Sequence, residues 1–156
     1  MVEERYVVGL VVERRRLDSP WADHAWAPVL VFPTAPDTPA WTLLGSTPTA
    51  ARYYAGPAEL ALYSTETAHY HDNLATGTPL LWIGLRPSGR EPPVEIVAVT
   101  ADPTEGECLT ETGTNVVETV PMPPEIAGEI ARFVAEYHVE REFVKRQRDR
   151  RSSAKE

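Results

Sequence analysis

Prolines constrain the fold of this chain more than any other residue type, because 15 of its 156 residues are proline. Proline fixes φ at about −65° and lacks a backbone N–H, so it interrupts helices and central strands. The proline content is about twice the usual frequency of roughly 5%. Many of the prolines stand between apolar runs, as in Phe32–Pro39 and Pro121–Pro124. The pattern therefore predicts strands punctuated by stiff loops.

Runs of apolar and β-branched residues predict a mostly antiparallel sheet of about six short strands. Gly56-Pro57 separates two of these runs and predicts a hairpin turn. Val94–Thr100 is expected to pair antiparallel with Pro79–Arg86, the most apolar run. The runs assigned to strands are Tyr6–Val12, Val29–Phe32, Ala51–Ala55, Ala58–Tyr63, Pro79–Arg86, Val94–Thr100 and Val116–Val120.

Two short helices and one long C-terminal helix complete the expected α+β fold. Ser64 or Thr65 can cap a short helix that ends near Leu74. Asp102, followed by proline at the first helical position, predicts the N-terminus of a second helix that ends near Thr112. The long amphipathic helix is predicted by apolar residues that recur at helical spacing. These residues are Ile126, Ile130, Phe133, Val134 and Tyr137.

The charge of the chain is unevenly distributed. Residues 1–140 carry 8 basic and 20 acidic groups, whereas residues 141–156 carry 7 basic and 3 acidic groups. We expect one α+β domain over 1–140 and a basic, partly disordered extension over 141–156. An acidic body repels nucleic-acid phosphates, so the charge argues against a nucleic-acid partner.

The sequence also predicts a cytoplasmic protein without a membrane partner. Glu3 and Glu4 precede the first apolar run, the reverse of a basic signal-peptide start. No run approaches the roughly 18 apolar residues that a membrane-spanning helix needs. Cys108 is the single cysteine, so an internal disulfide and a thiolate-rich zinc site are both excluded.

The main candidate site follows the first strand, where Arg14, Arg15 and Arg16 are consecutive. On a strand, Arg14 and Arg16 share one face and Arg15 points to the other. Two guanidinium groups on one face suit a phosphate or a carboxylate. The alternative is that these arginines pair with acidic neighbours such as Glu13 or Asp23.

Aromatic residues and a histidine follow these arginines. Trp21, His24 and Trp26 could stack on a planar ligand or contact a partner, and the alternative is that the tryptophans seal a loop onto the core. His69 and His71 look like a metal motif, but on a helix their side chains point about 200° apart. We therefore expect no metal site and no cofactor. No catalytic motif is present, so no catalytic residue is assigned.

Several short segments of the sequence resemble those of a small bacterial family of unknown function. They include Gly9–Arg16, Pro20-Trp21, Trp26–Val29, Arg52–Gly56, Glu66-Thr67, Tyr70, Asn73-Leu74, Leu85–Pro87, Val120–Pro123 and Phe143–Arg146. Members of that family tend to be encoded beside molybdenum-dependent formate dehydrogenases and their maturation factors. The resemblance implies an accessory role and supplies no catalytic residues.

These observations favour an accessory or interaction protein that assists the assembly, maturation or activity of a molybdenum-dependent oxidoreductase. Its protein partner would contact the arginine and tryptophan residues and a cationic, partly apolar tail. The tail consists of Phe143, Val144, Lys145 and Arg146. The alternative is a small-ligand protein that binds a molybdopterin or nucleotide with the same arginines and tryptophans. A pocket that holds both arginines together with an indole would favour this alternative.

Overall fold

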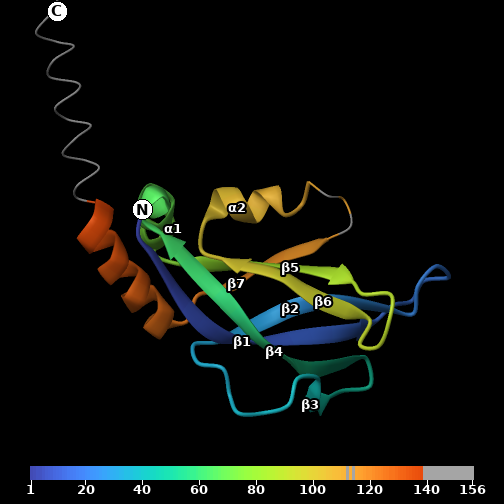
Figure 1. Cartoon of the computed structure of the whole chain (residues 1–156). Coiled ribbons are helices and arrows are strands. Elements are labelled where there is room, and N and C mark those ends of the chain that lie inside the picture. Colours follow the sequence, from blue (N-terminus) through green and yellow to red (C-terminus); the bar gives the residue numbers. More distant parts are fainter. Residues whose placement is uncertain (112, 114, 139–156) are drawn as a thin grey trace, which may run out of the picture.

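A computed structural model describes residues 1–111, 113 and 115–138, and nearly half of these residues lie in strands. The strands are β1 (Glu3–Arg16), β2 (His24–Phe32), β3 (Thr42–Ser46), β4 (Ala50–Tyr63), β5 (Leu80–Pro87), β6 (Val94–Thr100) and β7 (Val116–Pro121). They form one sheet in the order β2-β1-β4-β6-β5-β7, with β3 paired to β4 off this path. The edge strands β2 and β7 contact one another, so the sheet nearly closes into a barrel (Figure 1).

The barrel-like sheet has one weak seam. Its pairings are antiparallel except between β4 and β6, which run parallel and meet at a single residue pair, Leu60 and Val99. The antiparallel pairings of β1 with β2 and β4 are much longer. Continuous pairing therefore holds β1 at the centre of one half of the sheet.

The expected α+β fold, with about six short strands and a long C-terminal helix, is wrong. β1 and β4 have 14 residues each, because they pair with one another over almost their whole length. The described helices are η1 (Ser64–Glu66), α1 (Thr67–Ala75), α2 (Pro103–Cys108) and a helix over residues 124–138. The remainder of the predicted C-terminal helix lies outside the described residues. The part of the chain that is described contains no helix long and apolar enough to cross a membrane.

The predicted hairpin turn at Gly56-Pro57 is also wrong. Both residues lie inside β4, where Gly56 pairs with Leu10 and Pro57 pairs with Gly9. The pairing register shifts between Leu10 and Val11, and Gly56 has a φ of 117°. The glycine thus permits an irregularity inside a continuous strand. The sequence had instead suggested that the chain reverses direction at this point.

Local predictions near β5 and β6 are confirmed. Val94–Thr100 is β6, and it pairs antiparallel with β5. Asp102 caps α2, accepting hydrogen bonds from the backbone N–H groups of Thr104 and Glu105, and Pro103 is the first helical residue. The helix ends at Cys108, before the expected Thr112, and Cys108 is exposed.

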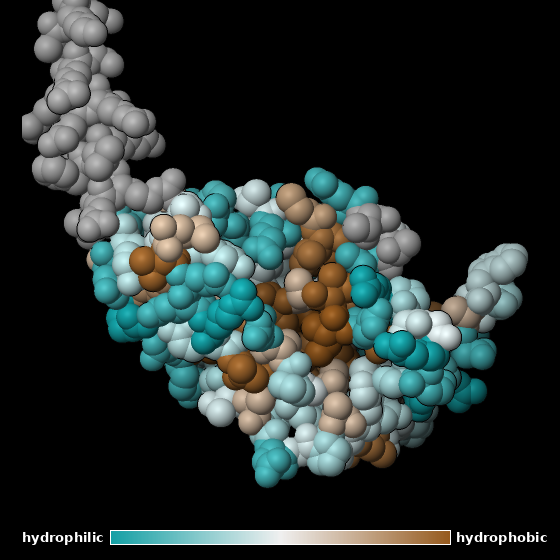
Figure 2. Space-filling view, viewed as in Figure 1, coloured by the Kyte–Doolittle hydropathy of each residue, from teal (hydrophilic) through white to brown (hydrophobic). Residues whose placement is uncertain are grey.

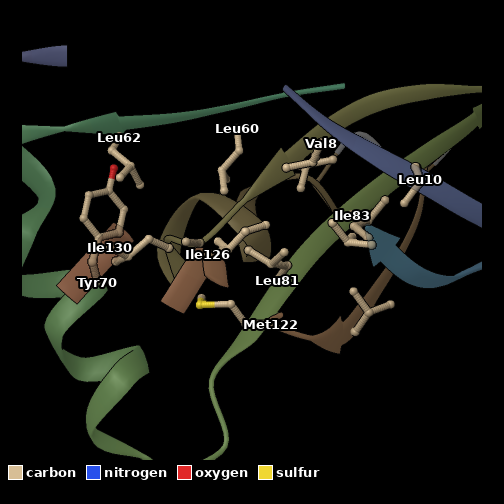
Figure 3. Close-up of a cluster of buried hydrophobic side chains, with 14 of the residues drawn as sticks. Val8, Leu10, Leu60, Leu62, Tyr70, Leu81, Ile83, Met122, Ile126 and Ile130 are labelled. Atoms are coloured by element: carbon tan, nitrogen blue, oxygen red, sulfur yellow. The ribbon is translucent and has the colours of Figure 1, made fainter. Parts of the chain in front are cut away.

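The apolar core fills the interior of the sheet, and helices cover one end of it. Figure 3 shows side chains from the strands, from α1 and from the helix over residues 124–138 pointing toward one another. Tyr70 and Phe133 contact each other edge to face, with ring centroids 6.3 Å apart. Apolar residues also gather on the face shown in Figure 2, over β5 and β6 beside α2. The β1–β2 hairpin projects from the opposite end of the barrel (Figure 1).

Candidate functional site

Arg14 and Arg16 extend the core-facing side of β1 beyond the core. Side chains alternate along a strand, so these two arginines share a face with Val8, Leu10 and Val12, which are all fully buried. Opposite them on β2, Trp26 pairs with Arg14 and His24 pairs with Arg16. The inner face of the barrel thus changes from apolar to cationic where β1 leaves the body of the protein.

Arg15 lies on the other face, as the strand periodicity predicted. It forms an ion pair of 2.7 Å with Glu13, which also pairs with Arg52 at 2.8 Å. The hydrogen bonds from Arg15 and Arg52 lower the pKa of the Glu13 carboxyl group. Arg15 is therefore neutralised within the chain by Glu13, one of the two acidic neighbours that the sequence analysis named as possible partners.

Arg14 and Arg16 have no such neutralising partner among the described residues. The described chain contains eight arginines, and the other six all form ion pairs with glutamates. Asp23 lies near both arginines but forms no ion pair with them in the described structure. Among the described arginines, these two therefore lack a carboxylate partner.

The two arginines line a surface hollow of about 580 Å³ between the base of the β1–β2 hairpin and the β3–β4 turn. His24 and Asp23 from the hairpin contribute to its wall. The turn contributes Ser46, Thr47, Pro48 and Thr49. Arg16 also donates a backbone hydrogen bond of 2.8 Å to the carbonyl of Thr49, which ties the hairpin base to the turn. The hollow is concave, polar and open to solvent.

A cluster of aromatic rings packs beside Arg14. Trp26 contacts Trp41 and Tyr53, each with ring centroids 5.8 Å apart, and the Arg14 guanidinium lies 5.8 Å from the centre of the Tyr53 ring. Trp41 has a φ of 69°, a left-handed conformation that is strained for a bulky residue. The sequence assigned Trp26 to the site but missed Tyr53, although Tyr53 lies two residues from Ala51, the partner of Arg14 on β4.

Trp21 is separated from this cluster. It lies in the loop of the β1–β2 hairpin with 91% of its surface exposed. The loop is closed by a hydrogen bond from the Leu17 N–H to the Asp23 carbonyl. Among the described residues that line the hollow there is no tryptophan. The two indoles expected at one site therefore lie in different places, Trp26 against the core and Trp21 in solvent.

His69 and His71 lie on α1 and face different neighbours, as helical geometry predicted. The imidazole of His71 stacks on that of His138, with ring centroids 5.4 Å apart. His69 contacts the carboxylates of Glu66 and Asp102, and the hydrogen bond with Asp102 raises the pKa of His69. The sequence did not connect His69 with Asp102, which is 33 residues away.

The proposed tail, Phe143, Val144, Lys145 and Arg146, lies outside the described residues.

The fold and the hollow define this chain as a small, mostly-β protein with an arginine-lined recess at one end of its sheet. Residues 7–147 match the model of a protein family of unknown function, DUF3305. This match covers most of the chain, which therefore belongs to that family. No curated protein and no solved structure matches the sequence.

Proposed function

We propose that this protein is an accessory binding protein whose arginine-lined hollow receives an acidic segment of a protein partner. The observation that carries this proposal is the pairing pattern of the arginines. Six of the eight described arginines are neutralised by glutamates, and Arg14 and Arg16 are not. Guanidinium groups on one face bind carboxylates with strong, charge-assisted hydrogen bonds.

Trp21 supports a protein as the partner. A tryptophan with 91% exposure makes few contacts within its own chain, and it projects from the same hairpin that carries Arg16 and His24. Tryptophan and arginine are the residue types most enriched among the dominant contacts of protein interfaces. Together, the hollow and the hairpin loop offer one charged and one apolar contact to the same surface.

The family resemblance supplies the kind of partner. We propose a molybdenum-dependent oxidoreductase of the formate dehydrogenase type, or one of its maturation factors, because related proteins tend to be encoded beside these enzymes. The role is assistance to assembly, maturation or activity in the cytoplasm. Turnover chemistry in this chain is not part of the proposal.

Charge reversal at the hollow tests the proposal. Full-length tagged protein with Arg14→Glu and Arg16→Glu should recover at least about tenfold less partner than wild type, since loss of a dominant contact costs more than about 1.4 kcal/mol. The matched control is Arg86→Glu with Arg90→Glu, which makes the same charge change at two arginines that pair with Glu95. Equal partner recovery by both double variants, together with unchanged dehydrogenase activity, would refute the proposal.

The basic tail is proposed as a second docking segment on sequence grounds. It combines apolar Phe143 and Val144 with cationic Lys145 and Arg146. Deletion of residues 141–156 from the Arg14→Glu and Arg16→Glu variant should reduce partner recovery below that of the charge-reversal variant with its tail intact. If the deletion leaves recovery unchanged, the hollow and its hairpin carry the interaction by themselves.

The alternative is a phosphate-bearing small ligand such as a molybdopterin or nucleotide. The concave hollow holds both arginines as this alternative requires, but the described residues that line it include no indole. A volume of about 580 Å³ falls within the size range of small-molecule sites, roughly 300–1,000 Å³. Trp26 pairs with Arg14 in the sheet, so its fluorescence should report occupancy. Saturable quenching by a nucleotide or molybdopterin dinucleotide, lost in the Arg14→Glu and Arg16→Glu variant, would support this alternative. No saturable change below millimolar concentration would remove it.

A further inference from the structure

A second cluster of functional groups lies at the opposite end of the barrel, where α1 meets α2. Glu66, His69 and Asp102 each present one ligand atom, and these atoms all lie within 4.8 Å of one another. Nδ1 of His69 is 3.0 Å from both carboxylate oxygens of Asp102 and 3.1 Å from Oε2 of Glu66. The residues come from the η1–α1 segment and from the N-cap of α2.

From this geometry we propose that Glu66, His69 and Asp102 form a binding site for one divalent transition-metal ion. Ligand atoms that are each about 2.1 Å from a metal lie about 3.0 Å apart in octahedral and about 3.4 Å apart in tetrahedral coordination. The distances from Nδ1 of His69 to Oδ2 of Asp102 and to Oε2 of Glu66, 3.0 and 3.1 Å, match the octahedral separation, and the third pair of ligand atoms lies within 4.8 Å. One imidazole with two carboxylates suits Zn²⁺, Mn²⁺ or Fe²⁺.

Asp102 has one oxygen to offer to such an ion. Its Oδ1 accepts hydrogen bonds from the N–H groups of Thr104 and Glu105, at 2.9 and 3.4 Å. Within the described part of the chain, Oδ2 contacts the imidazole of His69 and has no other hydrogen-bond donor. The side chain of Asp102 is 7% exposed, whereas those of Glu66 and His69 are each 38% exposed. The site is therefore anchored on its inner side and open to water on its outer side, where further ligands can complete the coordination.

A buried amide holds the two halves of the cluster in register. Asn73 lies one turn after His69 on α1, and its side-chain nitrogen donates to the carbonyls of Leu80 and Ala101. Its side-chain oxygen accepts a hydrogen bond from the N–H of Leu80. Ala101 directly precedes Asp102, so Asn73 fixes the distance between α1 and the N-cap of α2. Ligands fixed in this way lose little conformational entropy when they bind an ion.

The same contacts can also exist without a metal, as a hydrogen-bonded histidine and aspartate. Calorimetric titration of full-length, chelator-treated protein with Zn²⁺, and separately with Mn²⁺, distinguishes the two arrangements. A metal site takes up one ion per chain with saturable affinity. Asp102→Asn keeps an N-cap acceptor for α2 but removes the carboxylate, and it should lower the affinity at least about tenfold. Glu66→Gln, at an exposed position, should lower it as well.

His71→Gln is the matched control. His71 lies two residues from His69 but faces His138, so this substitution should leave the affinity unchanged. If His71→Gln abolished binding, the stacked histidines would be the site and the proposal would be wrong. It would also be overturned if neither ion bound below millimolar concentration, or if Asp102→Asn and Glu66→Gln both bound as wild type does. Far-ultraviolet circular dichroism of each variant before titration separates loss of a ligand from loss of the fold.

Discussion

Two glycines in helices should respond to alanine with opposite signs, because only one of them lies against another side chain. Gly106 is buried in α2, and a Cβ built there would lie 2.6 Å from Cβ of Trp82 and closer still to its ring. Non-bonded carbons prefer about 3.5–4.0 Å. The overlap involves the rigid root of the tryptophan side chain, so α2 must move away from β5.

The magnitude follows from two opposing effects. Overpacking of this kind costs about 1–3 kcal/mol, and the gain in helix propensity from glycine to alanine is about 1 kcal/mol. With an overlap this large we take the upper value, so Gly106→Ala should destabilise the protein by about 2 kcal/mol. At roughly 2–4 °C per kcal/mol for a chain of this size, the thermal midpoint should fall by about 4–8 °C.

Gly128 provides the comparison. It is exposed in the helix over residues 124–138, and a Cβ there would meet no atom within 4 Å. Gly128→Ala should therefore gain about 1 kcal/mol, and its thermal midpoint should rise by about 2–4 °C. Thermal unfolding of both variants followed by circular dichroism is the assay. A midpoint for Gly106→Ala at or above that of wild type would refute the packing of α2 on Trp82 that the structure shows.

Two further predictions concern a pH-dependent ion pair and a buried amide. The pKa of Glu13 is lowered in the folded protein, so its stabilising contribution is present above the ordinary carboxyl pKa of 4.5 and is lost as the pH falls through the lowered value. In urea unfolding, the difference between wild type and Glu13→Gln should accordingly shrink from pH 7 to pH 3, and a constant difference would contradict the ion pairs. Asn73→Ala leaves three backbone groups without partners and should cost about 3 kcal/mol in the same assay, whereas a loss below about 0.5 kcal/mol would show that the amide does not clamp α1.

Local chemistry predicted the elements whose stability is local. Asp102 and Pro103 predict a helix N-terminus. The side-chain oxygen of Asp102 accepts hydrogen bonds from the first turn, and Pro103 has no N–H that would need a partner there. Both effects act within one turn. The alternation of Arg14, Arg15 and Arg16 between two faces is equally local, because it follows from strand geometry. The ion pair of Arg15 with Glu13, two residues away, confirms the alternation.

Non-local pairing decided the elements that the sequence did not predict. Gly56 and Pro57 are typical turn residues, but the long partner strand β1 provides a template along which β4 continues through them. Gly56 accommodates the bend through its positive φ. The same limit applies to His69 and Asp102. Glu66 and His69 are three residues apart at the start of α1, but Asp102 is the N-cap of α2, so its place beside them depends on the fold.

The position of Arg16 bears on the proposal that the hollow is a contact site. Val8, Leu10 and Val12 on the inner face of β1 are buried and stabilise the fold through their apolar surface. Arg16 follows them on the same face but is charged. Arg16 instead gains no ion pair within the described chain, and it pairs in the sheet with His24, another group that can carry positive charge. A carboxylate from a partner would supply the ion pair that Arg16 lacks among the described residues. Under the proposed function, this position of Arg16 serves the binding of an acidic partner segment and adds little to the folding of the chain.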